Sequence, residues 1–254
     1  MSYMASPFAL SMAELYFNGH SAINTVCSTL GISQGAGTTY TYVALFTDFP
    51  GDGATQSNEC TTGNFGGYAR VPVARNGSTN KKWTISAATG DVNAAPVTVS
   101  NADAINFAPC TSGTPTVKYW GLFDAISGGN LMVYGPLKAS GASWKVGMYS
   151  DTATNITYSK AHGLVLNDPV FVMNVYNAVP ADLPNGATAM TNGALYYARD
   201  ITTDSFKLAT TAGGSAVAFT NMGPYLFIKA ATLSVSSGTV CSFAAGNLVA
   251  ARIC

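Results

Sequence analysis

The chain has 254 residues, enough for one large or two modest domains whose hydrophobic core needs no metal or disulfide. Only 9% of the residues are Asp, Glu, Lys or Arg, and the 12 acidic residues balance the 12 basic ones. Because binding to nucleic acids or acidic membranes needs a clustered basic face, we expect neither. No apolar run approaches the roughly 18 residues of a membrane span, and the first residues lack a signal-peptide pattern, so we expect synthesis in a cytoplasm.

The composition also predicts the fold class and the association state. Short apolar runs separated by 26 glycines are typical of an all-β protein with short strands and tight turns. Because 48% of the residues are hydrophobic and few are charged, we expect apolar surface to be covered in a permanent assembly. The five cysteines lack the spacing of a zinc site, so we expect buried free thiols. They are Cys27, Cys60, Cys110, Cys241 and Cys254.

Residues 8–30 carry the helical pattern of this sequence, with Ser11 placed as a cap and Glu14 three residues later. The segment YTYVALFT at 40–47 predicts a strand, since aromatic and β-branched residues favour strands. A long polar loop follows at residues 48–67, and a loop of that length is expected to project and contact a neighbour. Further short strands are predicted at 68–74, 83–86, 97–99 and 104–107.

The segment VKYWGLFDAISGGNLMVYGPL at 117–137 predicts a β-hairpin. Its arms, 117–123 and 131–137, flank the turn-forming run DAISGGN. The first arm is apolar at nearly every position, so we expect it to be buried on both faces or to lie at a subunit contact. We therefore place this hairpin at the core of a β-sandwich.

The pattern changes after residue 140, where strands alternate with polar turns as in a small, self-contained β module. Such strands are predicted at 155–158, 169–175, 195–200, 205–209 and 216–220. The C-terminal residues 230–254 return to the apolar character of the first part. We therefore interpret 141–229 as an inserted small β domain, and 1–140 plus 230–254 as one sandwich.

The titratable residues do not suggest catalytic, cofactor or metal sites. His20 and His162 are far apart in the sequence, so a catalytic triad would require the fold to bring distant partners together. A calcium site formed by Asp48, Asp52 and Glu59 is an alternative, but their loop lacks the dense Asp/Asn alternation of calcium loops. We predict solvated turns instead.

Glycoside hydrolysis needs two carboxylates that face each other across a cleft, and the sequence has only two glutamates. Several aromatic residues offer surfaces on which sugars stack, but their clustering on the hairpin favours core or subunit packing. They are Tyr119, Trp120, Phe123, Tyr134 and Trp144. We therefore predict that the chain is not an enzyme and that it needs no cofactor.

Three motifs resemble a family of tailed-bacteriophage virion structural proteins that are labelled head decoration or tail-fibre proteins. The order PGDG, GGYAR and WGLFDAxSGGNL is carried by residues 44–53, 66–73 and 120–137, and SSGTVCSFAAGNL follows at 236–248. The resemblance implies a jelly-roll-like β-sandwich with an N-terminal helix, located in the virion. The inserted part is similar to a small β domain of phage tail and appendage proteins, where it acts as a spacer or surface module.

We expect a capsid decoration or cement subunit that lies on the capsid surface and binds the major capsid protein and copies of itself, with a trimer as the expected homo-oligomer. The alternative is a tail-fibre, baseplate or other appendage component that binds a host surface receptor through the inserted domain. A polysaccharide-degrading enzyme is the third class. The expected contact residues are Phe49, Pro50, Phe65, Tyr68, Tyr119, Trp120 and Phe123.

Overall fold

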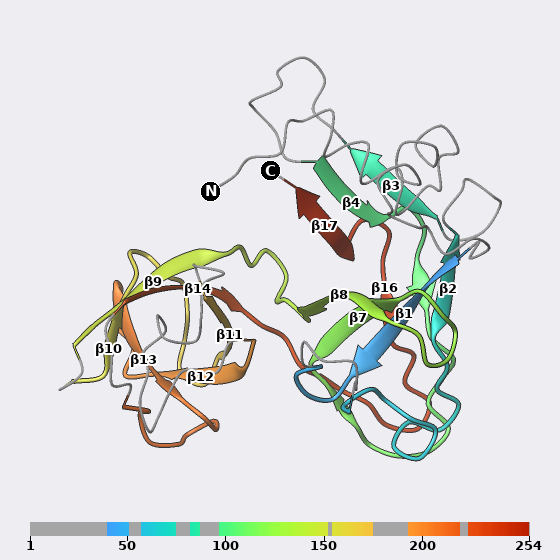
Figure 1. Cartoon of the computed structure of the whole chain (residues 1–254). Helices are drawn as coiled ribbons and strands as arrows, with labels where there is room; N and C mark the ends of the chain where they lie inside the picture. Colours follow the sequence, from blue (N-terminus) through green and yellow to red (C-terminus); the bar gives the residue numbers. More distant parts are fainter. Residues whose placement is uncertain are drawn as a thin grey trace. The chain divides into compact units, whose positions relative to one another are not determined.

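The computed structural model describes residues 40–50, 57–74, 82–86, 97–151, 154–174, 193–218 and 223–253, and their regular elements are all β-strands (Figure 1). The chain divides into a first unit, Met1–Gly135 with Ser234–Cys254, and a second unit, Pro136–Leu233. The helix expected at 8–30 lies outside the described residues. Among the described ranges no helix is long and apolar enough to cross a membrane.

The all-β fold class is confirmed for the described residues. The sequence predicts an inserted domain at 141–229. Whether the second unit folds alone as an insertion stays a prediction.

A four-stranded sheet forms the centre of the first unit, in the order β2-β1-β7-β8. Its strands are β1 (Tyr40–Phe46), β2 (Val71–Ala74), β7 (Tyr119–Phe123) and β8 (Leu131–Pro136). All five residues of β7 are buried, and β1 pairs with it antiparallel so that Leu45 lies opposite Trp120. The prediction of a hairpin whose first arm is buried on both faces is confirmed.

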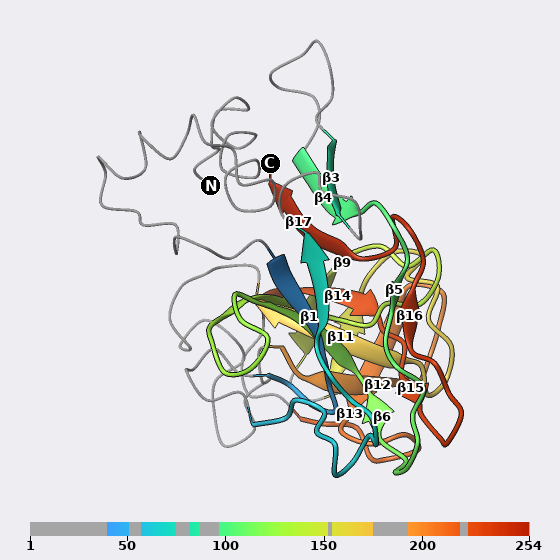
Figure 2. The ribbon, with the colours of Figure 1, turned by 90° about the vertical axis from the view of Figure 1, so that its right-hand side faces the viewer.

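Three smaller sheets complete the first unit, and each includes a strand from the C-terminal part of the chain (Figure 2). The three-stranded sheet has the order β17 (Val249–Ile253), β4 (Val97–Asn101), β3 (Trp83–Ser86). The two-stranded sheets pair β16 (Ser242–Phe243) with β5 (Ile105–Asn106), and β15 (Leu233–Ser234) with β6 (Thr116–Val117). These pairings join the C-terminal strands to strands that lie between residues 83 and 117. The jelly roll implied by the resemblance is not confirmed, because the described strands form one larger and three small sheets.

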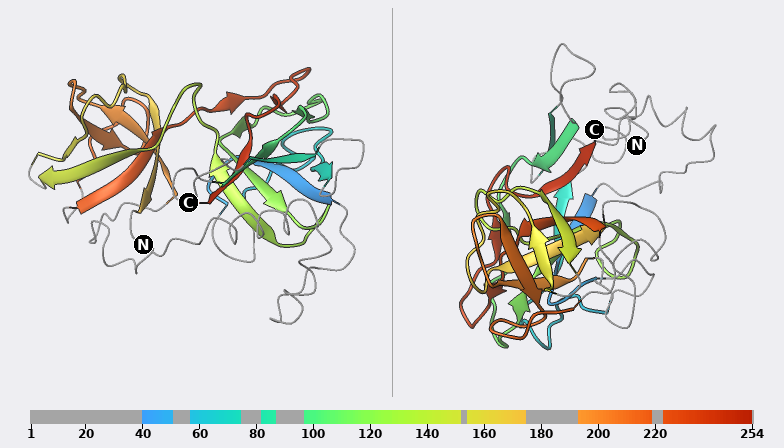
Figure 3. Two further views of the ribbon diagram at one scale, coloured as in Figure 1. Left: turned by 90° about the horizontal axis from the view of Figure 1, so that it is seen from above. Right: turned by 90° about the vertical axis from the view of Figure 1, so that its left-hand side faces the viewer.

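The second unit is a closed barrel with the strand order β10-β13-β12-β11-β14-β9, and every neighbouring pair is antiparallel (Figure 3). Its strands are β9 (Lys145–Asp151), β10 (Ile156–Tyr158), β11 (Pro169–Asn174), β12 (Leu195–Arg199), β13 (Ser205–Ala209) and β14 (Gly223–Lys229). The strand predicted at 216–220 is only an isolated bridge from Ala216 to Ala209 within the described residues. Conversely, β9 and β14 were not predicted.

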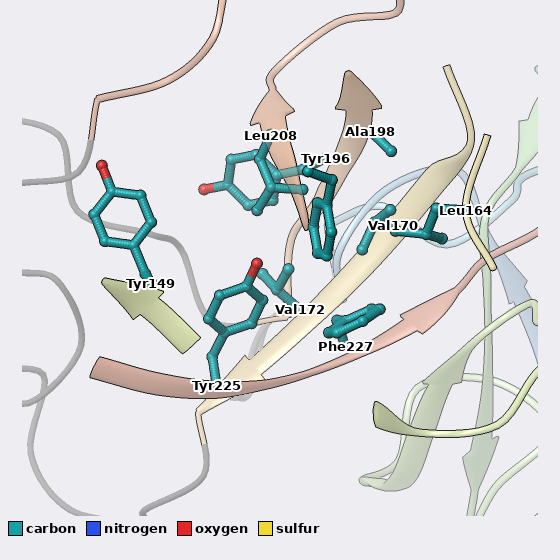
Figure 4. Packing of buried hydrophobic residues seen from close by; sticks show 10 residues of the cluster. Tyr149, Leu164, Val170, Val172, Tyr196, Ala198, Leu208, Tyr225 and Phe227 are labelled. Carbon is teal, nitrogen blue, oxygen red and sulfur yellow. The ribbon is translucent and has the colours of Figure 1, made fainter. Parts of the chain in front are cut away.

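The barrel interior is filled by alternate side chains of its strands (Figure 4). Large buried side chains include Tyr149, Tyr225 and Phe227, and the Tyr225 hydroxyl lies 2.8 Å from Thr157 Oγ1. Burial is the main cause that raises the pKa of Tyr225, so this hydroxyl stays protonated. At Gly147 a Cβ would lie 2.9 Å from the Thr157 side chain, so glycine allows these large side chains to fill the barrel.

Candidate functional site

The loop 124–130, between β7 and β8, is the most exposed part of the predicted hairpin. Residues 126–130 are exposed, and Ile126 keeps 61% of its surface accessible. Its tip carries no charged side chain. An exposed loop with an uncharged tip at the end of a buried strand is a common place for a binding surface.

The loop is closed by hydrogen bonds between its first and last residues. The Asn130 backbone N–H donates to Asp124 Oδ1 at 2.7 Å, and the Asn130 side-chain amide donates to Asp124 Oδ2 at 2.8 Å. Gly128 and Gly129 have φ values of 58° and 71°, in the left-handed region that favours glycine. A Cβ on Gly129 would lie 2.4 Å from Asp124 Oδ1, so a glycine at this position leaves room for the hydrogen bonds between Asp124 and Asn130.

Arg70 supports the loop from inside the first unit. Its Nη1 donates to the carbonyl oxygens of Ala125 at 2.8 Å and Gly128 at 2.7 Å. Its guanidinium carbon lies 3.4 Å from the centre of the Phe123 ring, a cation–π contact. A single buried arginine therefore holds two carbonyls of the loop and the end of the strand that leads into it.

The charge of Arg70 is neutralised by Glu59. Arg70 Nε donates to Glu59 Oε1 and Nη2 donates to Oε2, both at 2.7 Å. The side chains are 7% and 16% exposed, so both charges lie largely away from water and depend on each other. The Tyr68 hydroxyl donates to Glu59 Oε1 at 3.0 Å and accepts from the Leu45 N–H at 3.0 Å. Burial, followed by the charge of Glu59, raises the pKa of Tyr68.

This network joins the motifs that carry the family resemblance. Tyr68 and Arg70 come from GGYAR, whereas Phe123, Ala125 and Gly128 come from the hairpin motif. Both motifs are visible in the sequence, but their meeting at Glu59 is visible only in the fold. The available signal was composition, because a buried arginine needs an acidic partner and the whole chain has only 12 acidic residues.

The carboxylates considered for calcium do not converge in the described residues. Glu59 is occupied by Arg70, and Asp48 lies 3.7 Å from Lys118 and accepts from the Phe49 N–H at 2.9 Å. Asp52 lies outside the described residues. Across the parts of the chain that the structure describes, no three His, Cys, Asp or Glu residues are grouped to hold a metal ion.

The structure places most of the expected contact residues inside the first unit. Four of them, Phe65, Tyr119, Trp120 and Phe123, are buried there, as is Pro50. Phe49 is half-buried, with its ring 6.3 Å from that of Tyr119 and 5.6 Å from that of Tyr134. Tyr68 is half-buried and stacks on Phe107 at 6.1 Å. Packing within the unit accounts for these contacts, and an interface role of the seven residues stays a prediction.

The cysteines and the described histidine have structural environments. Cys60, Cys110 and Cys241 are buried free thiols, as expected, while Cys27 and Cys254 lie outside the described residues. Burial, then the neighbouring Cys241, raises the pKa of Cys60 to about 12, so this thiol is a poor nucleophile.

His162 is buried in the barrel and joins two of its turns. Its Nε2 lies 2.9 Å from the Thr202 carbonyl oxygen, and its Nδ1 accepts from the Leu164 N–H at 3.0 Å. Both ring nitrogens are therefore used within the fold. His20 lies outside the described residues.

Comparison with known proteins gives one family. The family described as Podophage GP4 fiber I protein gp80 matches residues 23–159, more than half of the chain, and this match includes Glu59, Arg70 and the loop 124–130. No curated protein matches the chain. The match makes the chain a bacteriophage structural protein of fibre type, with a location in the virion. The chain therefore belongs to the family of the podophage GP4 fiber I protein gp80.

Proposed function

We propose that this chain is a non-enzymatic subunit of a virion fibre and that its loop 124–130 contacts the host surface. The observation that carries the proposal is the combination of an exposed tip with a buried charged support. Arg70 holds the loop carbonyls and Glu59 neutralises Arg70, so the loop has its conformation before any partner arrives. A contact loop that is already ordered loses little conformational entropy when it binds.

The chemistry of the tip suits an uncharged partner surface. Ile126 offers an exposed apolar side chain, and Ser127 and the two glycines offer a hydroxyl and accessible backbone groups. The carboxylate of Asp124 is already bonded to Asn130 within the loop. We therefore expect binding that depends on shape and hydrogen bonds and that changes little with salt concentration.

We propose the fibre in place of the capsid decoration or cement role that was expected first, because the description of the matching family names a fibre protein. The two roles differ in location and copy number, because a cement protein covers the shell whereas a fibre subunit is confined to an appendage. Antibody labelling of intact particles by electron microscopy separates them. Label at the tail supports the proposal, and label distributed over the shell contradicts it.

We expect a non-enzymatic role, and the pairing of several described carboxylates with cationic side chains supports it. Glu59 is paired with Arg70, Asp168 with Lys229 at 2.7 Å, and Asp200 with Lys207 at 3.2 Å. Paired carboxylates of this kind are poorly suited to act as the facing acid and nucleophile of a glycosidase. Incubation of the purified chain with host surface polysaccharide should release no reducing ends, and any release above a boiled control would contradict this part of the proposal.

Binding by the loop is tested with labelled chain and host cells. Ile126→Asp places a charge at the tip and should reduce cell binding at least tenfold. Val240→Asp is the matched control, because Val240 is another exposed apolar residue of the first unit, 48% accessible, and lies outside the loop. Equal binding by the two variants would show that another surface makes the contact.

A further inference from the structure

The outer face of the barrel carries a set of exposed apolar side chains on four neighbouring strands. Tyr158 is 51% exposed, Met148 45%, Val146 56% and Met173 38%, and Pro224 and Leu226 between them are half-buried. We call these six residues the apolar wall. Large exposed apolar side chains are unremarkable when scattered, so the question is whether these lie next to one another.

The strand register shows that the six residues are contiguous. Met148 on β9 lies opposite Tyr158 on β10 and opposite Pro224 on β14. Leu226 on β14 lies opposite Val146 on β9 and opposite Met173 on β11. Directly opposed residues of antiparallel strands point to the same face. The wall therefore runs without interruption across β10, β9, β14 and β11, which are consecutive strands of the barrel.

The remaining two strands have a different outer face. Arg199 on β12 lies opposite Lys207 on β13, and Asp200 lies 3.2 Å from both of their side-chain nitrogens. Hydrogen bonds from Arg199 and Lys207 lower the pKa of Asp200, so this cluster stays charged. The outer surface of the barrel thus has a charged cluster on β12 and β13 and an apolar region on the other four strands.

We propose that the apolar wall is a self-association surface, which packs against the same wall of a second copy of this chain. The wall has no charged side chain, and the whole chain has 12 acidic and 12 basic residues, so a second copy brings neither local nor net repulsion. An exposed patch of this kind, on the order of 500 Å², supplies the apolar centre of an interface that covers about 800 Å² on each partner.

The geometry fits a symmetric contact. A surface that meets its own copy across a two-fold axis must match itself, and a continuous row of apolar side chains matches an identical row in chemistry. Face-to-face packing of two sheets is a standard way to bury such rows. The inference depends on the barrel alone and is independent of whether the loop 124–130 binds a host surface.

The first test measures association of the full chain by sedimentation equilibrium. Val146→Glu with Met148→Glu places two charges at the centre of the wall and should raise the dissociation constant at least tenfold. Leu166→Glu is the matched control, because Leu166 is 64% exposed and apolar but lies in the turn before β11. It should associate like wild type.

A wild-type chain that is monomeric at about 100 µM would overturn the proposal. At that concentration even a weak contact, with a dissociation constant of roughly 10 µM, would hold most of the chain as dimer. Unchanged association of the double variant would overturn it as well.

The second test avoids the risk that two glutamates disturb the barrel. A photoreactive benzoylphenylalanine replaces Met148 in the otherwise unaltered chain, and in a separate sample it replaces Leu166. The proposal predicts covalent dimers from the Met148 position, with the cross-link mapped to β9, β10, β11 or β14 of the second copy. Dimers only from the Leu166 position, cross-links to other strands, or no dimers from either position would contradict it.

Discussion

Arg70 and Glu59 form two parallel hydrogen bonds of 2.7 Å in the interior of the first unit. Both residues belong to the small charged fraction of the chain, which is 9% of its residues. A buried pair of this kind is sensitive to the loss of one partner, because the remaining charge has no water to solvate it. The pair therefore connects the stability of the unit with the shape of its exposed loop.

Removal of Arg70 should destabilise the first unit strongly. Arg70→Ala leaves Glu59 without its partner and frees the carbonyls of Ala125 and Gly128, so we expect a loss of about 3–5 kcal/mol in the free energy of unfolding. Lys118→Ala, at the exposed pair with Asp48, is the control and should change it by less than about 1 kcal/mol. Urea unfolding followed by tryptophan fluorescence measures both, and similar effects of the two variants would contradict the role of Arg70.

Gly129→Ala should disturb the loop through a clash as well as through its backbone angle. Gly238 provides the comparison, because it also has a positive φ, 86°, but a Cβ there meets nothing within 4 Å. Gly238→Ala should cost about 1 kcal/mol from the angle alone. Gly129→Ala should cost at least about 1 kcal/mol more and should reduce binding to host cells. Equal unfolding free energies for the two variants would mean that the Asp124 contact does not constrain the loop.

The first unit should lose stability at alkaline pH. Burial raises the pKa of Cys60 from 9.0 to about 12, so between these values the unfolded chain releases the thiol proton while the folded chain keeps it. The unfolding free energy therefore falls as the pH rises from about 9 towards 12. Cys60→Ala should show a shallower fall than wild type when urea unfolding is repeated at several pH values. Parallel curves would show that another group causes the loss.

In the barrel, the hydroxyls of Tyr225 and Thr157 should be energetically coupled. Tyr225→Phe and Thr157→Val each leave one buried hydroxyl without the 2.8 Å contact, and each should cost about 1–2 kcal/mol. The double variant leaves no such group, so its cost should be at least about 0.5 kcal/mol smaller than the sum of the single costs. Thermal unfolding of the wild type, the two single variants and the double variant measures these costs. A double-variant cost equal to the sum of the single costs would exclude the coupling.

The strands of the hairpin were predictable because aromatic and β-branched runs flank a turn with two glycines, and burial of every residue of β7 matches its uninterrupted apolar sequence. Strands β9 and β14 were missed for a physical reason. Val146, Met148 and Leu226 are apolar on the outer face while Tyr149 and Phe227 are apolar on the inner face, so no period-two pattern marks these strands. The outward-facing side chains of the apolar wall therefore remove the alternation by which these two strands could have been predicted.

The support of the candidate site was less predictable than its location. The turn at 124–130 is visible in the sequence, since Gly128 and Gly129 follow the buried strand directly. Arg70 reaches the carbonyls of Ala125 and Gly128 across more than fifty residues, and only the fold brings them together. Closure of the barrel likewise depends on the pairing of β9 with β14, which neither strand encodes locally.

The central claim is tested most directly by the rate at which phage particles adsorb to host cells in the presence of excess purified chain. If the loop 124–130 contacts the host, the wild-type chain and Val240→Asp should slow adsorption equally by occupying the host surface, whereas Ile126→Asp should leave the rate unchanged. Equal inhibition by Ile126→Asp, or no inhibition by the wild-type chain, would contradict the account.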